Sequence, residues 1–249
     1  MTNIKLFKLI TEGVYDQGIL KAIFLAGGPG SGKSWVGKQI FGIDSEETIR
    51  SFSNFGLKQV ANDIQFEKML KQQGYDPKDL QNLPPEEFKK LTVGDNSLRA
   101  KAKAIIDKQK DFFKQGRLGL IIDGTGQNYE KTRNQKKVLE SLGYDVGMVF
   151  VNTDLETAQK RNQRRKRQLP IDLIEELWHT VQKNLGKYQE MFGDNFVIVD
   201  NSAEEGEEFF KQYNKPQIKK VEKFLKAPVE NEAGKVWIEF QMQTRNRLK

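Results

Sequence analysis

A short apolar segment followed directly by a glycine-rich loop constrains this chain more than any other part of its sequence. Residues 21–26 have the length and composition of a buried strand, and the next eight residues fit the spacing Gly-x-x-x-x-Gly-Lys-Ser. The loop residues are Gly27, Gly28, Pro29, Gly30, Ser31, Gly32, Lys33 and Ser34. Glycines at this spacing let the main chain wrap around a phosphate, and the following helix presents the positive end of its dipole to the same anion. The sequence therefore predicts a strand, a phosphate-binding loop and a helix in succession.

The side chains at the end of this loop have expected roles in holding a nucleotide. Lys33 is expected to reach the β- and γ-phosphates of ATP, and the Ser34 hydroxyl is expected to ligate Mg²⁺. The alternative is a glycine-rich turn that binds nothing. We set it aside because the motif is complete and lies between a strand and a helix pattern.

The residue types that are missing exclude several kinds of chemistry. The chain of 249 residues has no cysteine and one histidine, which excludes disulfides, a cysteine nucleophile, zinc–cysteine sites and a multi-histidine metal centre. Any catalysis must therefore use carboxylates, hydroxyls, lysines, arginines or a hard cation. The formal charge of +7 suits a phosphate-bearing partner without identifying one.

Apolar runs of strand length alternate with helical periodicity along the chain. The candidate strands are residues 22–26, 57–61, 118–122, 146–151 and 196–199. Such alternation predicts an α/β fold of the P-loop NTPase type, in which a five-stranded, mostly parallel sheet carries helices on both faces.

The spacing of these strands predicts how the chain is divided. We expect a core over residues 1–203, a lid over about 154–170, and a basic C-terminal appendage over 204–249. The link over residues 64–117 is longer than a crossover helix requires, so we expect an insertion there that contributes to acceptor binding.

The insertion includes the clearest helix pattern in the chain, over residues 97–115. Its expected buried stripe consists of Leu98, Ala102, Ile105, Ile106, Phe112 and Phe113. Residues 95–97 are cap candidates, and Gly116 is a stop signal.

Two carboxylates follow strands and are candidates for the chemistry. Asp123 ends the third strand pattern, where a carboxylate can hold a Mg²⁺-bound water beside Ser34, although an ordinary turn aspartate fits the same position. Asp63 follows the second strand and is the candidate general base for a hydroxyl acceptor. Its alternative role is to cap the helix that begins near residue 64.

A run of basic residues follows the fourth strand. Spacing of three and four places Arg161, Arg164 and Arg165 on one helical face, with Arg167 off it. A solvated basic surface is the alternative, but the position after a strand favours a lid that brings guanidinium groups over the transferring phosphoryl group.

Other chemically suggestive residues are assigned to packing or left open. His179 lies on a predicted helix without a second histidine, so we assign it a structural role, and Trp35, Trp178 and Phe192 are interpreted as packing aromatics. Several lysines of the tail suit either a nucleic-acid backbone or a solvated helix, because glutamates are interspersed. These lysines are Lys211, Lys215, Lys219, Lys220, Lys223 and Lys226.

No segment has the roughly 20 consecutive apolar residues of a membrane helix. The first 16 residues lack the continuous apolar stretch of a signal peptide and are expected to form an amphipathic helix packed on the domain. We therefore expect a cytoplasmic protein with no membrane partner.

Together these motifs resemble the P-loop kinase group that includes zeta-toxin-like kinases and polynucleotide kinases, particularly versions from tailed bacteriophages. The resemblance covers residues 20–200 and rests on the phosphate loop, Asp63, residues 122–125 and the basic run 161–167. In that group the aspartate after the second strand activates the acceptor, and lid arginines bind the nucleotide phosphates. The resemblance implies those roles for Asp63 and for Arg161, Arg164 and Arg165.

The leading hypothesis is a kinase that uses ATP and Mg²⁺ to phosphorylate a hydroxyl on a nucleic acid or nucleotide. The acceptor stays open between a polynucleotide 5′-hydroxyl, a hydroxymethylated base in phage DNA, and a nucleotide sugar of the kind that zeta toxins modify. Alternatives of other classes are an ATPase without a small acceptor and a module in which the nucleotide stabilises a nucleic-acid-binding tail. The preference for ATP over GTP and the oligomeric state also stay open.

Overall fold

The computed structural model describes residues 14–43, 53–60, 62–164, 169–203 and 206–247. The strands are β1 (Lys21–Ala26), β2 (Lys58–Val60), β3 (Leu120–Asp123), β4 (Asp145–Asn152) and β5 (Phe196–Asp200). The helices are α2 (Lys33–Phe41), α3 (Asn62–Gln72), α4 (Pro85–Thr92), α5 (Leu98–Gln115), α6 (Tyr129–Ser141), α7 (Leu155–Gln163), α8 (Ile171–Phe192), α9 (Glu207–Tyr213), α10 (Lys215–Lys226) and α11 (Glu232–Arg247). Two short 3₁₀ helices are η1 (Pro77–Asn82) and η2 (Gly193–Asn195). The expected helix at the N-terminus falls outside the described residues, apart from its last few positions.

The strands form a single five-stranded sheet in the order β2-β3-β1-β4-β5, and every pairing between neighbours is parallel. This confirms the expected α/β class, with a sheet that is parallel throughout. The central strand is β1, so the loop that follows it emerges in the middle of the carboxyl edge, where parallel α/β sheets bind their ligands. The predicted strand at 57–61 shortens to three residues, and β3 extends to include Asp123.

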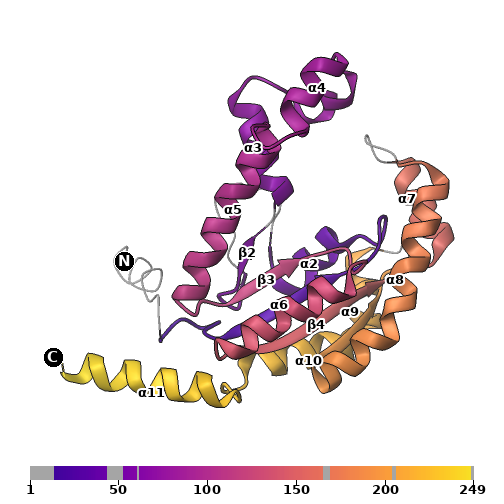
Figure 1. Ribbon diagram of the computed structural model, residues 1–249. Helices are drawn as coiled ribbons and strands as arrows, with labels where there is room; N and C mark the ends of the chain where they lie inside the picture. The colour runs from indigo at the N-terminus through magenta and orange to yellow at the C-terminus, as the bar shows by residue number, and fades with distance from the viewer. Residues whose placement is uncertain (1–13, 44–52, 61, 165–168, 204–205, 248–249) are drawn as a thin grey trace, which may run out of the picture.

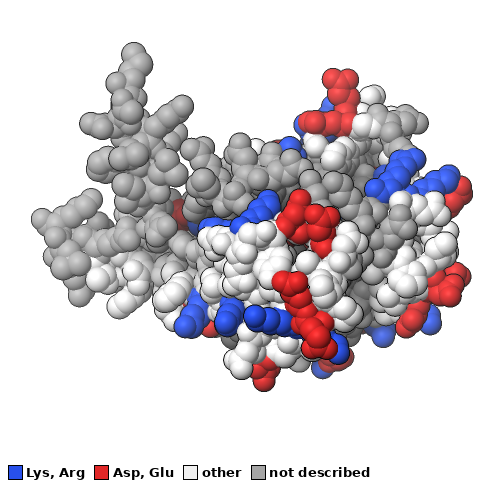
Figure 2. Space-filling model, turned by 90° about the horizontal axis from the view of Figure 1, so that it is seen from above, with Lys and Arg blue, Asp and Glu red and all other residues white. Residues whose placement is uncertain are grey.

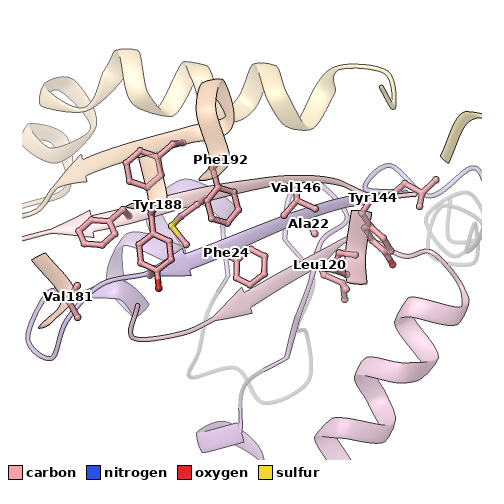
Figure 3. Packing of buried hydrophobic residues seen from close by; sticks show 14 of the residues in the cluster. Ala22, Phe24, Leu120, Tyr144, Val146, Val181, Tyr188 and Phe192 are labelled. Carbon is pink, nitrogen blue, oxygen red and sulfur yellow. The ribbon is translucent and has the colours of Figure 1, made fainter. Parts of the chain in front are cut away.

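Helices cover both faces of the sheet, as β1 requires because its six residues are all buried. Its side chains alternate between the faces. Ala22 and Phe24 join a core with α5, α6 and α8, whereas Ile23 and Leu25 join a core with α2, α9 and α10. Figure 1 shows the two groups of helices on opposite sides of the sheet, and Figure 3 shows the first core around Phe24.

The insertion between β2 and β3 forms an arm that rises from the edge of the sheet, with α4 at its far end (Figure 1). The arm has an apolar cluster of its own, made by Phe66, Leu70, Leu80, Leu91, Leu98 and Ala102. The expected helix is confirmed as α5, and the Ser97 hydroxyl caps it by accepting a hydrogen bond from the Ala100 N–H at 3.1 Å.

The expected apolar stripe of α5 is wrong at two positions. Ile105 is 46% exposed and Phe112 is 68% exposed, whereas Ala102 and Ile106 are buried. At 100° per residue, two residues seven positions apart point in nearly the same direction, so one rotation of the helix exposes both. The buried stripe of α5 is therefore narrower than the apolar composition indicates.

The C-terminal region begins with two helices that pack on the sheet. Phe210 of α9 and Val221 and Leu225 of α10 belong to the second core, so these helices share the packing of the strands despite lying beyond the boundary expected at residue 204. Trp237 and Ile238 of α11 pack against the first core, and the helix continues along the lower edge of the molecule in Figure 1. Within the described ranges, no helix combines the length and apolar character that crossing a bilayer requires.

Candidate functional site

The loop between β1 and α2 is bent by glycines in left-handed conformations. Gly30 and Gly32 both have φ of +78°, a region that side chains other than glycine rarely adopt. A Cβ added at Gly30 would lie 2.5 Å from the Ala158 carbonyl oxygen of α7, and one at Gly32 would lie 2.4 Å from the Asn201 amide nitrogen. The loop therefore needs glycine both for its dihedral angles and for its close contact with two neighbouring segments.

The polar groups of this loop are arranged around a site for an anion. The Ser31 side chain is buried, and its hydroxyl oxygen has no hydrogen-bond partner among the described residues. The Lys33 ammonium donates to the Gly27 carbonyl at 2.8 Å and so folds back over the loop. A buried hydroxyl without a partner is unfavourable, and a phosphate oxygen would satisfy it. These residues fit the triphosphate of a nucleotide.

Asn201, at the end of β5, connects the loop to α7. Its side-chain amide donates to the Ser31 carbonyl at 2.8 Å within the protein interior. Its main-chain carbonyl accepts hydrogen bonds from Arg161 Nη1 at 2.7 Å and from the Thr153 hydroxyl at 3.0 Å. Arg161 Nη2 also donates to the Ala203 carbonyl at 3.3 Å. The arginine thus fixes the segment after β5, and that segment in turn fixes the phosphate loop.

The N-terminus of α7 is capped by Asp154. Its carboxylate accepts hydrogen bonds from the Thr157 N–H at 2.7 Å and from the Thr157 hydroxyl at 2.9 Å. Partial desolvation acts to raise the pKa of Asp154, but these hydrogen bonds and one from the Ser202 hydroxyl outweigh it and hold the pKa below its ordinary value. The cap therefore stabilises the helix that carries Arg161.

A pocket of about 420 Å³ opens beside the phosphate loop. It is lined by Gly32, Trp35, Arg161, Arg164, Asn201, Ala203 and Gly206. Trp35 is 36% exposed, and its ring meets Phe210 edge to face with centroids 4.8 Å apart. An indole and two guanidinium groups can contact both faces of a flat aromatic ring. The pocket therefore suits the base of a nucleotide whose phosphates lie on the loop.

Two predicted metal ligands lie at the same edge of the sheet. Asp123 is the last residue of β3 and pairs in register with Leu25, two residues before the phosphate loop. The Gly124 N–H donates to the Leu25 carbonyl at 3.0 Å and extends this pairing past the strand. Ser34 lies exposed in the first turn of α2. A carboxylate and a hydroxyl at neighbouring strand ends are suitable oxygen ligands for Mg²⁺.

The structure describes the other predicted residues in part. The main chain of Asp63 lies in the first turn of α3, directly after β2, but its side chain is outside the described residues. Arg165 and Arg167 fall in the undescribed segment 165–168. Of the three lid arginines, Arg161 and Arg164 line the pocket together, with Arg164 at the C-cap position of α7.

The packing predictions hold for two of the aromatic residues. Phe192 is buried, and the Trp178 indole donates to the Thr153 carbonyl at 2.8 Å. For Trp35 the packing prediction holds in part, because its ring packs against Phe210 but also lines the pocket. Its position two residues after Lys33 is the sequence signal for the second role. His179 is exposed on α8, 3.8 Å from Glu175.

Comparisons with known proteins give distant similarities. No protein-family model and no curated protein matches the chain. Among solved structures, an RNA repair complex of Pnkp1, Rnl and Hen1 is similar with TM-score 0.46 and 16% identity, over 68% of this chain and 46% of that chain. The PezAT toxin–antitoxin system of Streptococcus pneumoniae gives TM-score 0.49 and 16% identity, over 90% and 92% of the two chains.

A third solved structure, shikimate kinase from Bacteroides thetaiotaomicron, gives TM-score 0.45 and 13% identity, over 83% of this chain and 99% of that chain. The present chain thus spans less than half the length of the first of these proteins. All three similarities are distant.

Proposed function

We propose that this protein is a phosphotransferase that moves the γ-phosphoryl group of ATP to a hydroxyl acceptor. The observation that carries the proposal is the buried Ser31 hydroxyl without a partner, in a glycine loop that Asn201 and α7 hold in a fixed shape. A preorganised ring of N–H groups with a lysine beside it is complementary to a triphosphate. The adjoining pocket with Trp35 has the size and lining for the base.

Each residue of the site then has a specific task. The loop N–H groups and Lys33 bind the β- and γ-phosphates, and Arg164 and Arg165 stabilise the charge on the transferring group. Ser34 and Asp123 would hold Mg²⁺, which neutralises charge on the phosphate oxygens when it is bound. Arg161 supports the segment that lines the pocket through its bonds to the Asn201 and Ala203 carbonyls.

Asp63 is the proposed general base. In the transfer, the acceptor oxygen forms a bond to the γ-phosphorus while the bond from that phosphorus to the bridging oxygen breaks. The electron pair leaves with ADP, and the acceptor proton passes to the Asp63 carboxylate. The first turn of α3, at the carboxyl end of β2, is on the edge of the sheet where the phosphate loop emerges.

We propose a nucleic acid or a nucleotide as the acceptor, bound between the arm and the lid. The arm carries exposed cations on α4 and α5, including Lys90, Arg99 and Lys101. Cations on an element that rises beside the phosphate loop favour an acceptor that itself bears phosphate. A nucleotide sugar has the same chemistry and is the second acceptor to test.

The deciding experiment incubates the protein with γ-labelled ATP, Mg²⁺ and separate pools of DNA, RNA and nucleotide sugars. Label on a hydroxyl of one pool supports the proposal and identifies the acceptor class. Labelled free phosphate in every pool, with no labelled acceptor, refutes transfer to these acceptors and indicates an ATPase.

Two variants separate binding from chemistry. Lys33→Ala should lower the transfer rate constant by about 10²- to 10³-fold, because it removes one cation that stabilises the transition state. Asp63→Asn should lower it by about 10²- to 10⁴-fold while ATP affinity stays nearly unchanged. Full activity in Asp63→Asn would remove the aspartate from the mechanism.

A further inference from the structure

The outer surface of α9 and α10 combines exposed aromatic rings with lysines that pair with no carboxylate among the described residues. We call it the α9–α10 face and define it by Phe209, Tyr213, Lys215, Lys219 and Lys223. It lies on the side of the sheet covered by α2, away from the arm, α6 and α8 (Figure 1). The face begins directly after the segment that lines the nucleotide pocket, but none of its residues lines that pocket.

The two aromatic residues are already stacked on each other before any ligand binds. Phe209 and Tyr213 are one helical turn apart, with ring centroids 5.7 Å apart and an interplanar angle of 11°. Phe209 is 37% exposed and Tyr213 is 60% exposed, so the stack is open to solvent. A third flat ring can extend such a stack with little loss of side-chain entropy. Stacking a base on a protein aromatic contributes about 1–3 kcal/mol.

A second opening lies beside this stack. A pocket of about 250 Å³ is bounded by Phe209, Phe210, Tyr213, Asn214, Gly206 and the segment 200–203. Its volume is sufficient for one base-sized ring next to the phenol and phenyl groups. Both residues of the stack thus line this pocket, which shares Asn201, Ala203 and Gly206 with the pocket beside the phosphate loop.

The lysines of α10 fall into two groups. Lys226 pairs with Glu222 at 3.1 Å, and Lys220 donates to the Phe196 carbonyl at 3.3 Å. In contrast, Lys215, Lys219 and Lys223 make no ion pair and no side-chain hydrogen bond with the described part of the chain. Their spacing of four places them on one stripe, with about 6 Å between successive positions along the helix axis. Three uncompensated cations in a row fit a chain of regularly spaced phosphates.

The buried side of α10 favours a nucleic acid over a membrane surface as the polyanionic partner. Val221 and Leu225 are buried in the second core, and Ile218 packs against it. The helix therefore has no free apolar stripe to insert into a bilayer, as a membrane-bound amphipathic helix requires. In addition, the face seen in Figure 2 carries lysines, arginines and acidic residues next to one another, whereas the stripe on α10 is of one sign.

We propose that the α9–α10 face binds single-stranded nucleic acid. Bases stack on Tyr213 and Phe209, and phosphates follow Lys215, Lys219 and Lys223. A single strand fits because its bases are unpaired and available for stacking, unlike those of a duplex. The inference does not depend on phosphoryl transfer.

The test measures binding of the full chain, without ATP, to a fluorescein-labelled oligothymidylate about twelve nucleotides long, by fluorescence anisotropy. The variant Lys215→Gln/Lys219→Gln/Lys223→Gln removes three phosphate contacts. Between about 50 and 200 mM salt, it should make the negative slope of the logarithm of the binding constant against the logarithm of salt concentration less steep by about 2. Its matched control, Lys131→Gln/Lys137→Gln/Lys183→Gln, removes the same charge from exposed positions on α6 and α8 and should keep the slope within measurement error.

Tyrosine variants test the stacking separately. Tyr213→Ala should weaken binding about 5- to 150-fold, whereas Tyr213→Phe keeps the ring and should bind like the parent protein. Circular dichroism and thermal unfolding confirm that each variant is folded, as expected for exposed positions. The pair of Tyr213 variants remains informative if the triple lysine variant is unstable.

Several results would overturn the inference. These are the absence of oligonucleotide binding, equal losses in the two triple variants, unchanged affinity in Tyr213→Ala, or tighter binding to a duplex or to vesicles rich in phosphatidylglycerol. The phosphotransferase proposal is judged independently. A protein that binds the strand here but labels no acceptor refutes only that proposal, and a kinase that shows no binding at this face refutes only this inference.

Discussion

Replacing Asn201 by alanine tests whether the phosphate loop is held in shape from the end of β5. The Asn201 side-chain amide donates to the Ser31 carbonyl at 2.8 Å, and it lies where a side chain on Gly32 would otherwise be. Alanine keeps the main-chain bonds that Asn201 makes with Arg161 and Thr153, because those use its carbonyl oxygen. The substitution therefore removes one contact to the loop and leaves the rest of the network in place.

The expected magnitude follows from the burial of this hydrogen bond. Asn201 is 5% exposed and Ser31 is 2% exposed, so the Ser31 carbonyl loses its donor in a place that water does not reach. An unsatisfied buried polar group costs about 1–3 kcal/mol. The loop can avoid that cost by moving toward solvent, but nucleotide binding must then restore the original shape. We therefore expect the Kd for ATP to rise by about 5- to 150-fold.

The assay is isothermal titration of a non-hydrolysable ATP analogue, together with thermal unfolding in the presence and absence of the analogue. Asn231→Ala is the control, since its side-chain amide also donates to a main-chain carbonyl, that of Glu140, at 3.0 Å. Asn231 lies beside Asp145 at the start of β4, which is the opposite edge of the sheet from the phosphate loop. It should lower the melting temperature while leaving the Kd nearly unchanged. An unchanged Kd in a folded Asn201→Ala protein would refute the role that we assign to Asn201.

Three further predictions concern the elements around the site. Asp154→Ala should destabilise the protein by about 1 kcal/mol near neutral pH. Because the pKa of Asp154 is depressed in the folded state, its contribution to stability is complete above the ordinary pKa of 3.8 and is lost as the pH falls through the folded-state pKa. Denaturant titrations at several pH values should show the difference in unfolding free energy between the variant and the parent protein disappearing in acid. Asp145→Ala breaks the buried ion pair of 2.7 Å with Lys21, so it should cost about 3–5 kcal/mol and lower the melting temperature by at least about 6 °C. Gly30→Ala should abolish measurable binding of the ATP analogue, because the added Cβ would overlap the main chain of α7. Gly28→Ala should be tolerated better, because a Cβ at that position has open space. Equal binding by the two variants would contradict the steric reasoning.

Much of the sheet could be predicted because its strands are apolar on both faces. In β1 and β4 a continuous apolar run of strand length is visible in the sequence, and the structure extends both predicted strands by only one or two residues. The shorter β2 was overestimated, since only Lys58–Val60 pairs with β3 before α3 begins at Asn62. Apolar composition alone does not show where pairing ends.

The phosphate loop was also predictable, because its residues are consecutive and fit one motif between a strand and a helix. The rest of the site depends on contacts between distant segments. Asn201 lies 170 positions from Ser31, and nothing in the sequence around either residue indicates that they meet. Such a pair becomes visible only when the order of the strands places the end of β5 near the loop. The prediction of the buried stripe of α5 was wrong for a related reason. Whether Ile105 or Phe112 has a neighbour to pack against depends on the tertiary structure.

The arginines of the basic run show that their positions depend both on their spacing in the sequence and on where the helix ends. Arg164 is the C-cap residue of α7, but it keeps helical main-chain angles and donates to the Lys160 carbonyl at 3.3 Å, so it stays on the face of Arg161. Arg161 is within the helix and donates to two carbonyls of the segment after β5, so part of its charge is used to stabilise the main chain. Arg164 is exposed at the end of the helix, where a small change in main-chain angles moves the guanidinium group far. Two arginines with the same predicted role therefore differ in the structure, and under the proposed function the one at the helix end is better suited to follow the transferring phosphoryl group.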